Sequence, residues 1–457
     1  MNSAGTQRRD FLKKLGLGTI ALGAGIAAPK VLGRTANGFL VENQEEYGGI
    51  TVEMLTDGKL PYEANPDVLK SIEEHMNVFS RDGWDPVRKV EMEKALKEQG
   101  GKGIFEINMI DGKGKNPNQS RLDYALMQAA WATAHMDPFY DWESHSGAIN
   151  NMASFGKWDP SELDMNWNDV SIAVKHASLF YGATLAGIAK TNPLWIYDEY
   201  VDKGDESSDQ DTGNTRKVPS SMKNVIALAF EEDYDGIMNS PGRLASAAVG
   251  DGYSRMAVTS HKVAEFIRAL GFNAIPAGNG TALSIPIAID AGLGELGRNG
   301  LLITPKYGPR VRLAKVFTDM PLEADIPIRF GVKEFCDVCL TCAKDCPSNS
   351  ITEGSQTWEG ESVSNNKGVL KWYVKPEPCN DYNGFSCSNC KRNCPFNKPN
   401  NSWLHSVIRK NINLKIKPLD KLMVTFDQAS GYGEQVIDRE FWKKDGLNSI
   451  TARDPEV

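Results

Sequence analysis

Eight cysteines in two short runs are the strongest constraint on what this 457-residue chain can fold into. All of them lie between Cys336 and Cys394, and both runs end in Cys-Pro. A disulfide-stapled protein spreads its cysteines through the parts that it crosslinks, and a zinc site takes its four ligands as two pairs. The two runs fit neither pattern. They read CDVCLTCAKDCP, with Cys336, Cys339, Cys342 and Cys346, and CNDYNGFSCSNCKRNCP, with Cys379, Cys387, Cys390 and Cys394.

The first run has the spacing C-x2-C-x2-C-x3-C-P, which is typical of bacterial proteins that hold two 4Fe–4S clusters. The second run keeps C-x2-C-x3-C-P but stretches its first gap to seven residues. In such proteins the fourth cysteine of each run binds the cluster of the other run, and the clusters carry single electrons. The rest of the chain must therefore hold the group that they reduce. The spacing predicts one cluster on Cys336, Cys339, Cys342 and Cys394 and another on Cys379, Cys387, Cys390 and Cys346.

The charge of the chain is unevenly distributed. Its formal net charge is −8, yet residues 1–36 hold six Lys or Arg and a single acid, Asp10. The remaining residues hold 45 Lys and Arg against 58 Asp and Glu, which is a net charge of −13. Nucleic-acid binding requires a basic surface, so this acidic body argues against a nucleic-acid partner.

The N-terminal sequence TQRRDFLKKLGLGTIALGAGIAAPKVLG resembles a twin-arginine export signal. The Arg8-Arg9 pair precedes an apolar run from Leu15 to Ala28, which is shorter than the roughly 20 residues that span a bilayer. The alternative is a basic amphipathic helix. We assign residues 1–36 to the signal, and because no other long apolar run follows, we expect a mature chain that is soluble or peripheral to a membrane.

Strand and helix patterns alternate in the middle of the chain. NVIALAF (224–230), FNAIPAG (272–278) and VRLAKVFTDM (311–320) predict strands, and GYSRMAVTSHKVAEFIRALG predicts a helix closed by Gly271. On that helix Tyr253, Met256, Ala257, Ser260, Ala264 and Ile267 share one face. These elements indicate an α/β layered domain.

Together these patterns divide the whole chain into five segments. The signal is followed by a helical and irregular unit at 37–145, whose tryptophans, including Trp131, are predicted to lie in the core, with a pocket wall as the alternative. We expect the α/β domain at 146–330 with an insertion at about 171–222, a two-cluster domain at 331–400, and a tail at 401–457. The tail contains a predicted helix, SWLHSVIRK (402–410), and is expected to pack back onto the body.

The stretch GLGELG matches the glycine pattern of a dinucleotide-binding turn through Gly292, Gly294 and Gly297. SIPIAIDA precedes it in the position of a strand, and Asp319 follows at a suitable distance. A dinucleotide turn must also open a helix, but RNGLLITPKYGPRVRL has too many glycines and prolines to form one. The glycines therefore permit close approach to another group or build a tight loop.

Taken together, the twin-arginine start, AGLGELGRNGLLITPKYGPRVRL and the two cysteine runs resemble the respiratory reductive dehalogenases, best over residues 222–405. This resemblance implies a nitroreductase-like domain that holds a corrinoid in its base-off form, beside a bacterial ferredoxin-like domain with two 4Fe–4S clusters. It implies corrinoid contacts at Gly292, Gly294, Gly297 and Arg298. No D-x-H-x-x-G motif is present, so no histidine ligand to cobalt is expected.

The resemblance also implies three catalytic residues. Tyr253 in GYSRMA is the proton donor, Arg312 in VRL is its cationic partner, and Asn279 in AGNG orients the substrate. A tyrosine keeps its proton at neutral pH, and a nearby cation stabilises the phenolate that donation leaves behind. Without the resemblance the residues favour a core tyrosine, a surface or paired strand charge and a turn asparagine, and the motif contexts reverse that interpretation.

The function implied is reductive removal of halide from a chlorinated alkene, alkane or aromatic compound as the last step of a respiratory chain. The family further implies a separate membrane-anchor protein, a respiratory electron donor, a location on the outer face of the cytoplasmic membrane, and it allows a homodimer. Two alternatives are an epoxyqueuosine-reductase-like corrinoid enzyme, which would be cytoplasmic, and an electron carrier with clusters only. The carrier would leave most of the chain without a purpose, because two clusters need only about 60 residues.

Overall fold

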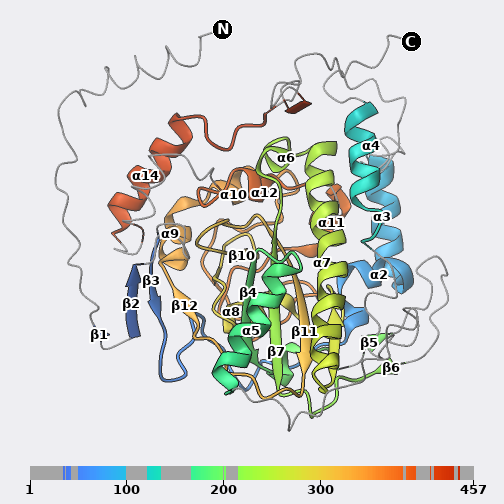
Figure 1. The fold of residues 1–457 in the computed structure, drawn as a ribbon. Coiled ribbons are helices and arrows are strands. Elements are labelled where there is room, and N and C mark those ends of the chain that lie inside the picture. The colour runs from blue at the N-terminus through green and yellow to red at the C-terminus, as the bar shows by residue number, and fades with distance from the viewer. Residues whose placement is uncertain are drawn as a thin grey trace.

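The computed structural model describes residues 34–35, 38–42, 50–98, 121–134, 166–198, 200–201, 215–383, 387–397, 412, 416–436 and 441–442 (Figure 1). Residues 1–33 of the predicted signal and the predicted helix at 402–410 lie outside this set. Among the described residues, no helix has the length and apolar character needed to cross a bilayer.

An antiparallel sheet of four strands forms the centre of the molecule, in the order β4-β7-β11-β8 (Figure 1). β7 and β11 pair over eight residues, from Asn224 with Thr318 to Glu231 with Val311. The three strands predicted in this region are confirmed. The strands are β4 (Leu185–Lys190), β7 (Asn224–Glu231), β8 (Ala274–Ala277) and β11 (Val311–Thr318).

Helices cover both faces of the sheet, because the central strands bury side chains on both sides. In β7, Ile226, Leu228 and Phe230 pack with residues of α7 (Arg243–Ala269), whereas Val225, Ala227 and Ala229 pack toward α8 (Ser284–Asp290). α5 (Trp167–Phe180) joins α7 on its side of the sheet. The mixed helix-and-sheet class is therefore confirmed. α7 ends as predicted at Gly271, whose φ of 93° suits the left-handed turn after a helix.

The expectation that SIPIAIDA forms a strand is wrong, because residues 284–290 form the helix α8. Its isoleucines alternate as in a strand, but Pro286 lies in the first turn, where a helix tolerates proline. Ile287, Ala288 and Ile289 are all buried against the sheet. The predicted insertion at about 171–222 contains β4 and most of α5, so part of that interval belongs to the main layers of the domain.

A second sheet, in the order β1-β2-β3-β12, joins the N-terminal strands to the start of the cysteine region. Its core contains Val52, Phe330 and Phe335, together with Met423 and Val424 of α14, which lies beside α9 (Figure 1). The elements of this layer are β1 (Arg34–Thr35), β2 (Gly38–Glu42), β3 (Thr51–Met54), β12 (Ile328–Arg329), α9 (Val332–Cys339) and α14 (Lys417–Ala429).

Short elements complete the described structure. The N-terminal helices are η1 (Glu74–Met76), α2 (Val78–Trp84), α3 (Pro86–Glu98) and α4 (Arg121–Ala130). Around the central layer lie η6 (Pro193–Trp195), α6 (Tyr234–Met238) and the strand pairs β5 (Tyr200–Val201) with β6 (Thr215–Arg216) and β9 (Glu295–Leu296) with β10 (Leu302–Ile303). The cysteine region adds α10 (Thr341–Lys344), α11 (Pro376–Asn383) and α12 (Asn389–Arg392).

Candidate functional site

The three predicted catalytic residues come together at one end of the central sheet. Asn279 Nδ2 donates a hydrogen bond to the Tyr253 hydroxyl oxygen at 2.8 Å. The Arg312 guanidinium carbon lies 3.8 Å from the centroid of the Tyr253 ring, which is close range for a cation–π contact. Tyr253 comes from α7, Arg312 from β11 and Asn279 from the turn after β8. We call these residues the Tyr253 trio.

Gly252 allows α7 to approach β11 closely enough to form the trio. A Cβ atom at this position would lie 2.6 Å from Arg312 Cγ, well inside ordinary contact distance. The added Cβ atom would also lie 3.6 Å from Cγ of Glu232, the residue that follows β7. The glycine in GDGYSRM is therefore a requirement of the packing beneath Tyr253, and it is a signal that sequence analysis left unused.

Trp131, for which the sequence favoured core packing, lies directly against Tyr253. Its ring stacks on Tyr253 with centroids 5.0 Å apart and an angle of 30° between the ring planes. Its Nε1 donates to the Ser246 carbonyl at 3.2 Å, which fixes the ring against α7. The Tyr253 ring is thus held by an aromatic neighbour and a cation, while its oxygen accepts from an amide. These contacts restrict the phenol to one orientation.

Arg312 is partly buried, and its hydrogen bonding differs from that of the neighbouring Lys391. Its Nε is buried, and no described residue accepts a hydrogen bond from it. The neighbouring Lys391 is instead bound by both oxygens of Glu232, at 2.6 and 2.7 Å. Burying an unpaired donor is costly, so the Arg312 guanidinium is a suitable partner for an anion or for negative charge that develops during a reaction.

Lys315 supports the turn that carries Asn279. This side chain is fully buried within β11, and its Nζ donates to the Gly278 carbonyl and, at 2.9 Å, to Ser284 Oγ. Burial lowers the pKa of Lys315 to about 7. The two contacts tie the start of the turn to the start of α8, which restrains the position of Asn279. The sequence carried no sign of this role, because a lysine in a strand is usually at the surface.

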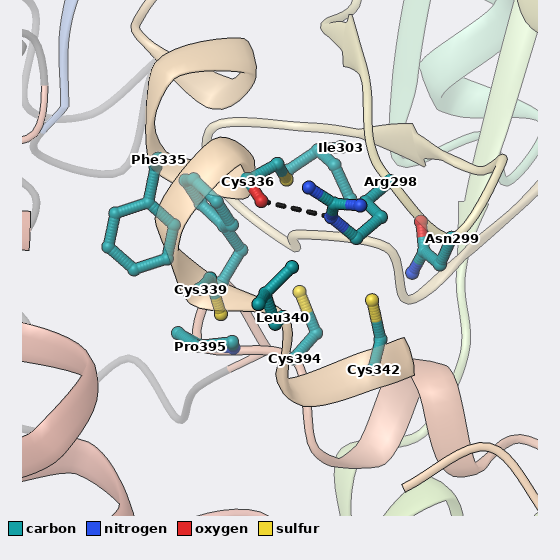
Figure 2. Close-up of a pocket in the computed structure, with 11 residues that line it drawn as sticks. Arg298, Asn299, Ile303, Phe335, Cys336, Cys339, Leu340, Cys342, Cys394 and Pro395 are labelled. Atoms are coloured by element: carbon teal, nitrogen blue, oxygen red, sulfur yellow. Dashed lines mark hydrogen bonds between the residues drawn. The ribbon is translucent and has the colours of Figure 1, made fainter. Parts of the chain in front are cut away.

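Four cysteines from the two runs line one cavity, which Figure 2 shows. They are Cys336, Cys339 and Cys342 of the first run and Cys394 of the second, the set that the spacing assigns to one cluster. Leu340, whose φ is 57°, turns the chain between α9 and α10 so that Cys339 and Cys342 both border the cavity. Phe335, Ile303 and Phe396 close it with apolar surface.

The chemistry of these thiols suits a polynuclear cluster. Burial raises the pKa of Cys336 to about 12, and Cys339 adds to the effect; burial, followed by Cys336 and Cys394, raises the pKa of Cys342. Four thiols around an apolar cavity are a donor set for a cube of irons, which replaces the thiol protons when it binds.

The remaining four cysteines also influence one another. Burial raises the pKa of Cys390, and the neighbouring Cys379, Cys387 and Cys346 raise it further. For Cys346, burial opposes ionisation, but hydrogen bonds from Ser348 and from the Ser350 N–H, 3.3 Å from Sγ, lower its pKa overall. This second group is the set that the spacing assigns to the other cluster. Cys390 also raises the pKa of Cys342, so the two groups are neighbours.

The glycine loop packs against the protein itself. Added Cβ atoms would lie 2.6 Å from the Ile326 carbonyl oxygen at Gly292, 2.2 Å from the Ile303 carbonyl oxygen at Gly294, and 2.8 Å from Ile303 Cγ1 at Gly297. No helix follows, as expected, and the loop contains the β9–β10 pair. The need for glycine is therefore explained by close approach within the chain. The predicted contact with a corrinoid is a separate hypothesis.

Glu295 ties this loop to the entrance of the cysteine region. Its buried carboxylate accepts N–H hydrogen bonds from Phe330 at 2.5 Å and Val332 at 3.3 Å. Burial nevertheless raises its pKa to about 7. Arg298, which is predicted as a corrinoid contact, lines the cysteine cavity (Figure 2). It donates to the carbonyls of Cys336, Thr352 and Gly354 at 3.0, 2.8 and 2.8 Å.

Comparison with known proteins relates this arrangement to characterised chains. No protein-family model matches. The chain is 35% identical over 363 residues to the tetrachloroethene reductive dehalogenase of Sulfurospirillum multivorans, with 72% of each protein covered. It is 38% identical over 393 residues to the protein of the same name from Desulfitobacterium hafniense, which covers 72% of this chain and 71% of that relative.

Among solved structures, the catabolic reductive dehalogenase NpRdhA has a similar fold. The TM-score is 0.61 at 19% sequence identity, and the match covers 86% of this chain and 50% of that one. The chain thus spans about half the length of the solved protein, and the likeness establishes a shared fold.

Proposed function

Since this chain belongs to the reductive dehalogenase family, we propose that it removes halide from an organohalide at the Tyr253 trio. The carbon–halogen bond breaks, two electrons and a proton are taken up, and the products are a carbon–hydrogen bond and a halide ion. The observation that carries the proposal is the convergence of Tyr253, Asn279 and Arg312 from three separate elements. The hydrogen bond from Asn279 and the positive charge of Arg312 would both stabilise the phenolate that Tyr253 becomes when it donates its proton.

Tyr253 donates the proton from its hydroxyl group. Its oxygen already accepts a hydrogen bond from Asn279, and such a bond strengthens when the oxygen becomes negative. Arg312 lies over the ring, where its positive charge stabilises the phenolate. General acids placed in this way contribute about 10²- to 10⁴-fold to a rate. Reprotonation from solvent returns the tyrosine to its starting state.

We propose that a base-off corrinoid binds beside the trio. When bound, it supplies a low-valent cobalt that passes electrons to the carbon–halogen bond. The buried Arg312 Nε, which has no partner among the described residues, is consistent with a further group or a developing charge at this position. Gly292, Gly294 and Gly297 are retained as predicted backbone contacts, although the space that their missing side chains leave is filled by the chain itself.

The two groups of cysteines would hold the two 4Fe–4S clusters that supply single electrons. Lys391 follows Cys390 directly and binds Glu232, whose side chain lies beside Gly252 and Arg312. The second group of cysteines is therefore joined to the trio by a short series of contacts. This connection supports electron delivery to the trio from the cysteine region, because electron transfer requires the donor and acceptor sites to be near each other.

The substrate we propose to test first is tetrachloroethene, because the two relatives carry that name. Chlorinated alkanes and chlorinated aromatics are the other classes. We also propose export by the twin-arginine route to the outer face of the cytoplasmic membrane, with a separate membrane anchor and a respiratory electron donor. The Arg8-Arg9 motif supports export. Cell fractionation tests it, and a protein found only in the cytoplasm would contradict it.

An anaerobic assay of halide release tests the proposed activity. The reconstituted protein, with an artificial low-potential reductant, is offered tetrachloroethene, a chloroalkane and a chlorophenol. We expect stoichiometric halide and hydrogen-substituted product from at least one of them. A protein with full cobalt and iron content that releases no halide from any of the three would contradict the proposal.

A further inference from the structure

Helix α11, which carries Cys379, is fastened to the N-terminal helices α2 and α3 by two buried arginines. In the sequence, α11 lies almost 300 residues after these helices, yet Arg81 and Arg88 both reach it. Cys379 is the ligand that the stretched seven-residue gap separates from Cys387, Cys390 and Cys394. Close spacing alone therefore does not fix its position relative to the other ligands.

Arg88 forms the centre of the attachment. Its side chain is 0% exposed, and it makes two hydrogen bonds with the carboxylate of Asp381, at 2.6 and 3.2 Å. The same guanidinium bonds Asp82 at 2.9 Å and Glu91 at 3.1 Å. Asn380 Nδ2 donates to Asp82 as well, which adds a link from α11 to α2. Planar guanidinium groups suit such paired carboxylate contacts.

Arg81 makes a second attachment one turn away on α11. It bonds Glu377 at 2.6 Å, Ser364 at 3.0 Å, and its own helix end through Asp85 at 2.8 Å. Ser362 Oγ donates to the same Glu377 oxygen. The ring of contacts leaves both charges paired and largely out of water.

Helical geometry places Cys379 opposite these attachments. Glu377 and Asp381 are four residues apart in α11, so they share one face of the helix. Cys379 lies two residues from each and therefore points to the other side. One face of α11 is thus held by the two arginines, and Cys379 lies on the opposite face of the helix.

We propose that Arg81 and Arg88 are positioning residues for the second iron–sulfur cluster, and that they hold α11 where Cys379 can bind it. This inference rests on the proposed function only for the presence of two clusters. It predicts that the attachment controls one cluster and not the other. The first cluster would be bound by Cys336, Cys339, Cys342 and Cys394. None of these four ligands lies on α11, so this cluster does not depend on the position of that helix.

The test compares iron content in holoproteins that carry Arg88→Met or Arg268→Met. Arg268 is a matched control, because it is a buried arginine in the last turn of α7 that pairs with Glu265 and donates to the Ala274 carbonyl. Wild type and Arg268→Met should hold about eight irons per chain and show magnetic interaction between two reduced clusters by electron paramagnetic resonance. Arg88→Met should hold about four irons and show the signal of one isolated cluster.

Two further variants keep the test decisive if Arg88→Met fails to fold. Asp381→Asn removes the charge that Arg88 binds on α11, and Arg88→Lys keeps the positive charge without the paired geometry. Two results support the proposal. Asp381→Asn should lose the second cluster and keep the first, and Arg88→Lys should keep more of the second cluster than Asp381→Asn does.

Full iron content and a wild-type spectrum in both Arg88→Met and Asp381→Asn would overturn it, as would equal loss of both clusters. A wild-type protein with fewer than about eight irons would instead contradict the cluster content of the proposed function.

Discussion

The Tyr253 trio and the cysteine region are built in contrasting ways. The trio stands on the longest regular elements of the described structure, the 27-residue α7 and the eight-residue β11, with an apolar core on each face of the sheet. The cysteine region consists of helices of four to eight residues joined by turns. It is held by buried polar contacts such as those of Arg298, Arg88 and Lys391.

This difference indicates how each region keeps its geometry. The trio obtains its precision from the packing of long regular elements around two apolar cores. The cysteine region has buried thiols whose pKa is raised by burial, so its folding should be coupled to the binding of metal. Changes in the trio should therefore alter the rate at constant metal content, and changes in the cysteine region should alter metal content or reduction potential.

The largest expected effect is that of Tyr253→Phe on turnover. Removal of the hydroxyl group should lower kcat by about 10²- to 10⁴-fold, because the general acid is lost. The ring that stacks on Trp131 and contacts Arg312 is kept, so cobalt and iron content should match wild type. Steady-state halide release measures the rate.

Tyr307→Phe is the control, because Tyr307 is a buried tyrosine outside the trio. It should retain nearly full activity. If Tyr253→Phe is as active as this control, the assignment of the proton donor is wrong.

Glu295→Gln tests the loop between the two regions. Burial raises the Glu295 pKa from its usual 4.5 to about 7, so the folded protein holds this proton more tightly than the unfolded chain does. The wild type therefore loses stability as pH rises from about 4.5 to 7, by about 3 kcal/mol from this group. The variant should be more stable than wild type by about 2–3 kcal/mol at pH 8 and by much less at pH 5.5.

Denaturant unfolding of both proteins at the two pH values measures this difference. A stability difference that is the same at both pH values would show that Glu295 does not titrate in this range.

Lys315→Met should have a moderate effect on the trio alone. It leaves the Gly278 carbonyl and Ser284 without their buried partner, and an unsatisfied buried acceptor costs about 1–3 kcal/mol. The loosened turn should lower kcat by about 10-fold through Asn279, with unchanged iron and cobalt. Lys315 acts on the trio only through the position of Asn279. The effects of Lys315→Met and Asn279→Ala on kcat should therefore be less than additive in the double variant. Full additivity would separate Lys315 from the trio.

Ser348→Ala should produce the smallest effect, confined to the cysteine region. The Ser348 hydroxyl lies 3.5 Å from Cys346 Sγ, and hydrogen bonds to cluster sulfur favour the reduced state. Its loss should lower the potential of one cluster by about 20–60 mV, which corresponds to one ordinary hydrogen bond. Redox titration followed by electron paramagnetic resonance resolves the two clusters. An equal shift of both potentials would contradict the assignment of Cys346 to one of them.

The sequence predicted the central elements because their signals are local. β7, β11 and α7 carry apolar patterns that match their burial, and Gly271 marks the helix end. SIPIAIDA misled because its alternating isoleucines resemble a strand, whereas the segment forms a short helix that buries three consecutive residues, Ile287, Ala288 and Ile289. The Tyr253 trio was accessible only through resemblance to a family, since no spacing rule relates residues on a helix, a turn and a strand.

Other features of the site could not be predicted from local sequence. The stacking of Trp131 on Tyr253 joins residues more than a hundred positions apart, and the contact between Arg88 and Asp381 joins residues 293 apart. Lys315 resembles a surface lysine until the sheet and turn are assembled around it. Such contacts depend on the complete fold. The local sign of close packing around Tyr253 is a pair of glycines on α7, Gly250 beneath Trp131 and Gly252 beneath Arg312.

Cobalt and iron counted per chain, on the same anaerobic sample that releases halide, test the central claim that the two regions serve one reaction. The account predicts about one cobalt and about eight irons, with activity proportional to cobalt when the corrinoid is supplied in limiting amounts. Halide release by protein that contains no cobalt would contradict the claim, and so would an active sample with iron for a single cluster.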